Sequence, residues 1–276
     1  MLSDVDIRRI YENYVLVNNA SEYLNRYIPL PLEKNGKRWK WEGKAFPRVI
    51  TVLEFDRIVR KYGIRPRKLL MYNGGDEGDP ELEYIQSDHV IFVNYKEATG
   101  ENDLQTLDLP EKDFDFVLCA QTLEHLYDPI AALERLFSHM LPGGYLFTSV
   151  PVVNIQHSTP FHHYTGYTPV GLGSVCCAAG FEILEIGQWG NINYISLVFS
   201  TKTWPDYRRL GESEHPKGRL RWVVYLLKTA WTRRSFARRN FDLSKPMREY
   251  YASCQNGLQN EFANPVEAWI LVRRPD

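Results

Sequence analysis

The sequence predicts a doubly wound α/β fold with a mostly parallel sheet. Strand-like apolar runs alternate with helical patterns through most of residues 67–190. The runs 114–120 and 145–150 flank a segment with apolar residues at helical spacing, and such a strand–helix–strand unit normally has parallel strands. The polar residues between strand and helix, AQTLEHLYDP, should therefore lie at the carboxyl edge of the sheet, where open α/β sheets bind ligands.

The other strands and helices are predicted from apolar runs, helix-capping residues and helix-breaking residues. We expect further strands at 68–72, 89–94, 181–189 and 268–272, a short third element at 103–110, and helices at 49–62, 81–87 and 169–179. The helix of the central unit should begin after Asp128-Pro129 and end at Pro142-Gly143-Gly144. Residues 1–28 also show helical spacing.

These elements suggest three parts of the chain. We interpret 1–65 as an N-terminal helical cap, 66–190 with 262–276 as the core, and 191–261 as a late, basic helical insertion within the core. The length of 276 residues, 44% of them hydrophobic, suffices for one large α/β domain with a subdomain.

The distribution of charge narrows the choice of partners. The formal net charge of -1 argues against a surface built as a whole for nucleic acid. The stretch 217–239, however, is basic and aromatic and contains no acid. It is either a helix packed on the core with a solvated basic face, or a peripheral contact with an anionic partner such as a phosphorylated substrate, lipid headgroups or nucleic acid.

Cysteine usage and the N-terminus indicate the compartment. The four cysteines show neither CxxC nor framework spacing, as expected in a reducing compartment. The N-terminal residues lack the basic and then apolar regions of a secretory signal. A transmembrane helix needs about 18 consecutive apolar residues, and no apolar run in this sequence approaches that length. We therefore expect a soluble, cytoplasmic protein without a transmembrane segment.

Two strand ends offer candidate ligand contacts. The strand 68–72 runs into a glycine-rich turn that contains Asn73, Gly74, Gly75 and Asp76. Acids in this turn would repel a phosphate, and GK[ST] is absent, so nucleoside triphosphates are excluded; a cationic or hydroxyl-rich ligand fits better. The strand 89–94 ends on the same edge at Asn94 and Tyr95, where nucleotide-binding sheets hold a ribose.

Two segments carry a resemblance to a known family. They are FDFVLCAQTLEHLYDPIAALERLFSHMLPGGYLFTSVP and TPVGLGSVCCAAGFEILEIGQWGN. In order and spacing they resemble the class I S-adenosylmethionine-dependent methyltransferases, particularly the branch that acts on small molecules, quinones and sugars. The resemblance covers roughly residues 65–190 and the final strand. It implies a Rossmann-like, seven-stranded sheet, S-adenosylmethionine as cofactor and S-adenosylhomocysteine as product.

The resemblance also implies a set of cofactor contacts. They are Asn73, Gly74, Gly75, Asp76, Asn94, Tyr95, Gln105 and Gln121. Three positions depart from the family pattern: the glycine motif is kept only in part, and Asn94 and Gln105 stand where the family has acids. A neutral amide can still hydrogen-bond a ribose hydroxyl, but less strongly than a carboxylate does.

Histidines supply candidates for the chemistry. Methyl transfer to a hydroxyl needs alignment and a general base, and histidine titrates in the suitable range. His162 and His163 follow the fifth strand, and His125 follows the fourth, all on the ligand edge. Each could equally be structural. Tyr164 and Tyr167 could wall a sugar or aromatic acceptor. Metal binding by His162 and His163 is an unsupported alternative, since no second set of ligands stands at a recognisable spacing, and we assign no metal site.

The leading hypothesis is an O-methyltransferase that acts on a small-molecule or glycan hydroxyl. The altered glycine motif leaves open a catalytically inactive methyltransferase-like binding protein. A nicotinamide-dependent enzyme fits less well, because the GxGxxG turn that holds a pyrophosphate is absent. Nucleic-acid methylation stays an alternative through 217–239.

Overall fold

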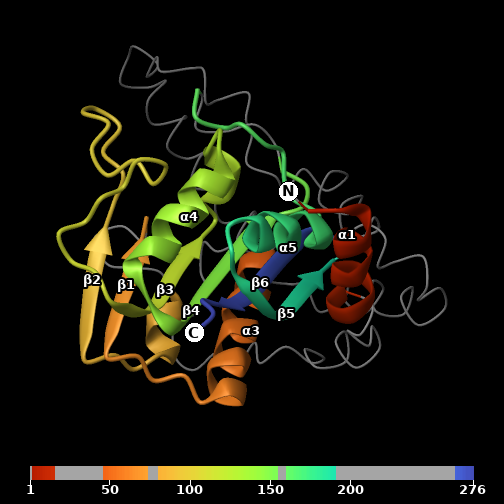
Figure 1. Cartoon of the computed structure of the whole chain (residues 1–276), viewed down its shortest axis with the longest axis horizontal. Coiled ribbons are helices and arrows are strands. Elements are labelled where there is room, and N and C mark those ends of the chain that lie inside the picture. Colours follow the sequence, from red (N-terminus) through yellow and green to blue (C-terminus); the bar gives the residue numbers. More distant parts are fainter. Residues whose placement is uncertain (1, 16–45, 74–79, 155–159, 191–264) are drawn as a thin grey trace, which may run out of the picture. The chain divides into compact units, whose positions relative to one another are not determined.

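The computed structural model describes residues 2–15, 46–73, 80–154, 160–190 and 265–276 (Figure 1). Nearly all of them belong to one structural unit, which comprises Met1–Asn19, Pro47–Trp189 and Pro265–Asp276. A central sheet with helices packed on it forms this unit.

The sheet of the described residues has six strands in the order β2-β1-β3-β4-β6-β5. Their bounds are β1 Lys68–Tyr72, β2 His89–Val93, β3 Phe114–Ala120, β4 Met140–Pro151, β5 Glu182–Trp189 and β6 Glu267–Arg273. Strands β1 to β4 pair in parallel, whereas β6 lies between β4 and β5 and is antiparallel to both. The prediction of a doubly wound, mostly parallel α/β sheet is confirmed. Six of the seven expected strands are present in the described part of the chain, and the segment 103–110, expected as a short third element, forms turns there.

Helices connect and cover the strands. They are α1 Asp4–Ile10, the π-helical turn η1 Tyr11–Val15, α3 Phe46–Tyr62, the 3-10 turns η2 Pro80–Tyr84 and η3 Leu123–His125, α4 Pro129–His139 and α5 Pro169–Ala178. Figure 1 shows α4 and α5 lying across the near face of the sheet. They bury Leu133, Leu136 and Leu172 in a core that includes Val117 and Leu146.

Helix α3 packs on residues of the opposite side of the strands. Its Phe55 ring makes edge contacts with Phe116 and Phe147, at centroid distances of 6.0 and 4.9 Å. These two phenylalanines alternate along β3 and β4 with Val117 and Leu146, which face α4 and α5. A helix that we assigned to the N-terminal cap therefore packs directly on the sheet.

The end of α4 differs from the prediction. Asp128 caps its start as expected, because Asp128 Oδ1 accepts a hydrogen bond from the Ala131 N–H at 3.0 Å and Pro129 is the first helical residue. The helix ends at His139, before the expected stop at Pro142-Gly143-Gly144, since Met140 already pairs with Phe114. The register then shifts before Phe116 pairs with Tyr145.

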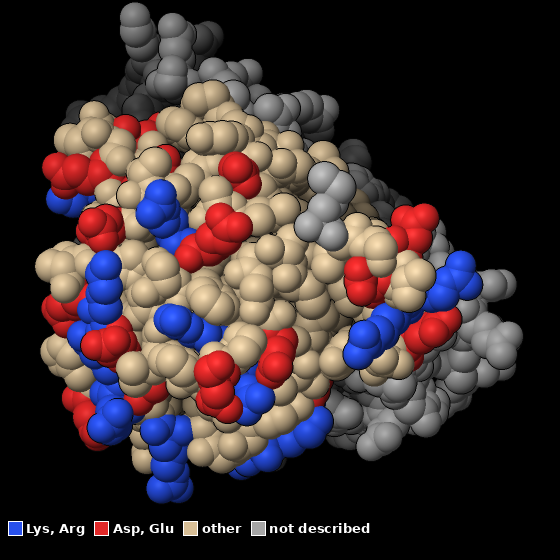
Figure 2. Space-filling model, viewed as in Figure 1, with Lys and Arg blue, Asp and Glu red and all other residues tan. Residues whose placement is uncertain are grey.

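Positive and negative side chains are interspersed over the visible face (Figure 2). Among the helices that the structure describes, none combines the length and the apolar character needed to cross a membrane. The basic stretch 217–239 lies outside the described residues, so its proposed anionic contact stays a prediction.

Candidate functional site

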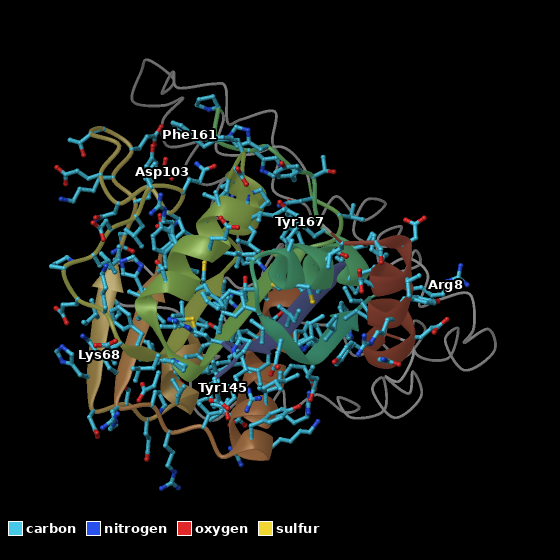
Figure 3. All side chains as sticks on the ribbon, in the orientation of Figure 1. Arg8, Lys68, Asp103, Tyr145, Phe161 and Tyr167 are labelled. Atoms are coloured by element: carbon cyan, nitrogen blue, oxygen red, sulfur yellow. The ribbon has the colours of Figure 1, made fainter. Side chains whose placement is uncertain are left out.

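The carboxyl ends of the parallel strands meet at one edge of the sheet. In Figure 3, the labelled residues Asp103 and Phe161 lie at this edge, and Lys68 and Tyr145 lie toward the opposite one. Of the predicted site residues, this edge gathers those that follow β1, β2, β3 and β4. Gly74, Gly75 and Asp76 lie outside the described residues.

Asn73 joins the ends of β1 and β2. Its N–H donates to the Val93 carbonyl at 2.9 Å, and its Oδ1 accepts from the Tyr95 N–H at 2.9 Å. Its φ of 59° lies in the left-handed region, which asparagine adopts more readily than most residues. The backbone thus turns at the place where the glycine-rich segment begins, as a close approach to a ligand requires.

The segment after β2 carries the polar residues Asn94, Tyr95, Asn102, Asp103 and Gln105, which we call the polar ledge. The Asn94 carbonyl accepts from Asn102 Nδ2 at 3.0 Å. Gln105 is held on both sides, because its Nε2 donates to Asp103 Oδ1 at 3.2 Å and its Oε1 accepts from the Asp128 N–H at 2.8 Å. Amide and carboxylate groups are the donors and acceptors that ribose hydroxyls and an adenine amine need, so this ledge fits the implied cofactor.

His125 is fixed by a backbone carbonyl. Its Nδ1 lies 2.9 Å from the Phe161 oxygen. A carbonyl oxygen only accepts, so in the neutral ring Nδ1 carries the hydrogen and Nε2 has the basic lone pair. The His162 ring packs against it edge-on, with centroids 5.4 Å apart. His163 is exposed, and its ring lies 6.2 Å from that of Tyr127.

Glu124, beside this histidine, is a residue that the sequence analysis did not select. It is 1% exposed, and its Oε1 lies 3.9 Å from His125 Nε2. Burial raises the pKa of the Glu124 carboxyl to about 7. Its Oε2 has no hydrogen-bond partner in the described part of the chain. The only sequence signal was an acid within LEH, between buried leucines.

Gln121 and Glu267 form a second polar pair close by. The Gln121 N–H donates to the Ser149 carbonyl at 2.8 Å, and its Nε2 donates to Ser149 Oγ at 3.2 Å and to Glu267 Oε1. Burial raises the pKa of Glu267 well above its usual range, and the nearby charge of Glu124 raises it further. Gln121, predicted as a cofactor contact, thus bonds to β4 and β6.

Aromatic side chains come from the segment after β3 and from residues 161–167 of the loop after β4. The Tyr164 hydroxyl donates to the Tyr127 carbonyl at 2.9 Å, and the Tyr164 and Tyr167 rings lie 5.3 Å apart. On the side of β2, the Phe161 ring contacts Tyr95 edge-on at 5.9 Å. Phe161 therefore touches the ledge through its ring and His125 through its carbonyl oxygen.

The described residues contain no group of three or more histidine, cysteine or acidic side chains that could hold a metal ion. The edge therefore offers one ledge of neutral and acidic hydrogen-bonding groups and, beyond it, a histidine with a neighbouring buried carboxyl. This arrangement can hold a polar ligand next to a proton acceptor.

Comparison with known protein families gives one match. Residues 75–186 match a family model described as Methyltransferase domain. Among curated proteins, no sequence matches significantly. One similar solved structure is a putative sarcosine dimethylglycine methyltransferase from Galdieria sulphuraria, with 12% identity and a TM-score of 0.46; the match covers 83% of this chain and 85% of that one.

Two further solved structures are similar. A phosphoethanolamine N-methyltransferase 2 from Haemonchus contortus, in complex with S-adenosyl-L-methionine, has 13% identity and a TM-score of 0.43, and the match covers 81% of this chain. It spans only 53% of the Haemonchus chain. A SAM dependent methyltransferase from Archaeoglobus fulgidus has 16% identity and a TM-score of 0.44, with 82% of this chain and 94% of that one covered.

Proposed function

We propose that this protein is a class I S-adenosylmethionine-dependent methyltransferase that methylates a hydroxyl group of a small molecule or glycan, with His125 as general base; the match of residues 75–186 to a methyltransferase domain supports the reaction class. The observation that carries this proposal is the contact between His125 Nδ1 and the Phe161 carbonyl at 2.9 Å. It orients the ring and leaves the basic lone pair on Nε2, the form that a proton acceptor needs.

S-adenosylmethionine supplies a methyl group that is activated by its sulfonium. Asn73, Asn94, Tyr95 and Gln105 would hold it along the ledge. His125 Nε2 takes the proton from the acceptor hydroxyl as its oxygen becomes the nucleophile. Because positive charge on the donor disappears in this reaction, the other residues act mainly by aligning the reactants and excluding water.

The aromatic residues support an acceptor with a ring. Tyr127 and Tyr164 are exposed, whereas Tyr167 is buried and donates to the Leu123 carbonyl at 3.3 Å. Exposed aromatic faces bind the apolar faces of sugars and aromatic compounds, and hydroxyl groups at their edges can reach polar partners. This agrees with a glycan-type or phenolic hydroxyl as methyl acceptor.

The experiment measures transfer of a labelled methyl group to a panel of sugar, phenol and amine acceptors. We expect His125→Asn to lower kcat by about a hundredfold, which is the usual contribution of a general base. The affinity for S-adenosylhomocysteine, measured by isothermal titration, should stay unchanged. His89→Asn is the matched control, because His89 is exposed at the start of β2, at the other edge of the sheet.

Three outcomes would contradict or change the proposal. Full activity of His125→Asn would remove His125 as the base, and the same substitution at His162 and His163 would then identify which of them acts. Transfer only to amines would replace the hydroxyl acceptor. Binding of S-adenosylhomocysteine without transfer to any acceptor would favour the second candidate, an inactive methyltransferase-like binding protein, which the amides Asn94 and Gln105 in place of acids motivate.

A further inference from the structure

Glu124 is a buried acid to which the proposed reaction assigns no role. Its side chain is 1% exposed, and one carboxyl oxygen lies 3.9 Å from His125 Nε2. The other oxygen has no hydrogen-bond partner among the residues that the structure describes. Burying a carboxyl that is incompletely hydrogen-bonded destabilises a protein, so its position next to the histidine calls for a physical reason.

We propose that Glu124 is a positioning residue for His125, whose carboxylate stabilises the imidazolium that forms when Nε2 takes a proton from the acceptor. This inference rests on the proposed function, since it takes His125 to be the base. During the step, the acceptor O–H bond breaks, its electron pair stays on oxygen, and the proton binds Nε2. The oxygen forms a bond to the methyl carbon as the carbon–sulfur bond breaks. The electron pair of the carbon–sulfur bond remains on sulfur.

The surroundings of the carboxyl favour this role. A charge of opposite sign at about 4 Å interacts far more strongly in a buried site than in water, because the interior screens charge weakly. Burial raises the pKa of the carboxyl to about 7, so near neutral pH the neutral and the ionised forms are both present, and the form that is already ionised acts in the step. The proton acquired by His125 then provides the positive charge that favours the ionised carboxyl.

Other titratable groups face Glu124 from neighbouring elements. Glu267 on β6 interacts with it unfavourably when both are charged, and Arg48 on α3 compensates the charge of Glu267. The phenol of Tyr167 lies within electrostatic reach, and the charge of Glu124 contributes to the raised pKa of Tyr167. Arg48 carries the positive charge in this group, and the His125 imidazolium, with Nε2 at 3.9 Å from Glu124 Oε1, is the cation that we expect to stabilise an ionised Glu124 in the described part of the chain.

The backbone of Glu124 adds a second link to the same site. Its carbonyl accepts hydrogen bonds from the N–H groups of His163 and Tyr164, at 3.0 and 3.1 Å. The loop held in this way includes Phe161, whose carbonyl binds His125 Nδ1. One residue therefore anchors the loop that orients the ring and also faces the opposite nitrogen of that ring.

The test is an NMR titration of the His125 ring in the unliganded protein. In Glu124→Gln we expect its pKa to fall by about one unit, which corresponds to a tenfold change in proton affinity. The acidic limb of the pH profile of kcat should move to lower pH by the same amount. The value of kcat should fall about tenfold, while KM for S-adenosylmethionine should stay unchanged. Glu124→Asp should restore part of the shift. Glu134→Gln, on the exposed side of α4, should change neither quantity.

An identical His125 pKa in wild type and Glu124→Gln would overturn the inference. This result is distinguishable from failure of the proposed function, which would show as full activity of His125→Asn, whatever the titration gives. If Glu124→Gln does not fold, a carbon-13 titration of Glu124 in the wild-type protein decides. Coupled titration with His125 supports the pair, and independent titration of the two groups contradicts it.

Discussion

At the scale of single residues, Glu124 links the stability of the fold to pH. Burial raises the pKa of this carboxyl from its ordinary 4.5 to about 7 in the folded protein. Between these values the folded state keeps a proton that the unfolded state has lost, so this residue lowers stability as pH rises from about 4.5 to about 7. Above pH 7 its destabilising contribution is complete.

We therefore predict that Glu124→Gln is more stable than wild type at pH 8 and similar to it at pH 5. The difference at pH 8 should reach at most about 3 kcal/mol, from about 1.4 kcal/mol per pKa unit. Urea unfolding at both pH values measures it. Glu267 titrates in both proteins, so only their difference is informative. Glu134→Gln should match wild type throughout. An equal difference at pH 5 and pH 8 would contradict the prediction.

Sequence patterns identified His125 as a candidate but not Glu124, for a physical reason. The role proposed for His125 rests on its residue type and its position after a strand, and the sequence shows both. The role proposed for Glu124 depends on burial and on a 3.9 Å distance, and these arise only from packing of the loop that follows β4. In the same way, Gln105 and Gln121 were selected by position, whereas their hydrogen bonds to Asp103 and Ser149 appear only in the fold.

At the scale of secondary structure, Asp128 at the start of α4 connects this helix to the candidate site. Asp128 Oδ1 caps the Ala131 N–H at 3.0 Å, and its own N–H donates to Gln105 Oε1 at 2.8 Å. We predict that Asp128→Ala lowers the free energy of unfolding by about 1 kcal/mol, as loss of an N-cap usually does. Urea unfolding at pH 7 measures this.

Two further variants are matched controls for this cap. Asp128→Asn should retain most of the stability, because asparagine caps about as well as aspartate. Thr168→Ala should cost a similar amount, since Thr168 Oγ1 accepts from the Gly171 N–H at 3.0 Å at the start of α5. If Asp128→Asn were as unstable as Asp128→Ala, the charge rather than the hydrogen bond would be responsible.

Most elements could be predicted because local signals agree with tertiary packing. β1 and β3 have the predicted bounds, and α3 ends before Gly63 as expected. The end of α4 could not be predicted, since pairing of Met140 with Phe114 draws residues 140–144 into β4 despite their helix-stop pattern. Long-range strand pairing overrides local breakers here.

At the scale of the whole molecule, the antiparallel last strand joins β5 to the rest of the sheet. The sequence indicated a strand at 268–272, but alternation of apolar residues does not tell which neighbours a strand will have. In the structure β6 lies between β4 and β5, where Glu267–Arg273 pairs with both. Its Trp269, Ile270, Leu271 and Val272 are fully buried.

This position leads to a prediction about truncation. Each fully buried large side chain stabilises a fold by about 1.5–3 kcal/mol, and a whole domain is stable by only about 5–15 kcal/mol. Removal of residues 267–276 should therefore abolish cooperative folding, because it removes four such side chains and leaves the facing edges of β4 and β5 without partners. Thermal melting followed by circular dichroism, with and without S-adenosylhomocysteine, measures this.

The matched control removes only Pro275 and Asp276. It keeps Arg274, whose N–H donates to the Gly144 carbonyl at 2.8 Å and whose carbonyl accepts from the Gly143 N–H at 2.9 Å. We expect this variant to melt cooperatively near the wild-type temperature and to gain stability with S-adenosylhomocysteine, as linkage requires of a ligand that binds the folded state. A cooperative, ligand-stabilised transition in the longer truncation would contradict this prediction. It would show that β1 to β5 fold without β6 and that the ligand site does not depend on this strand.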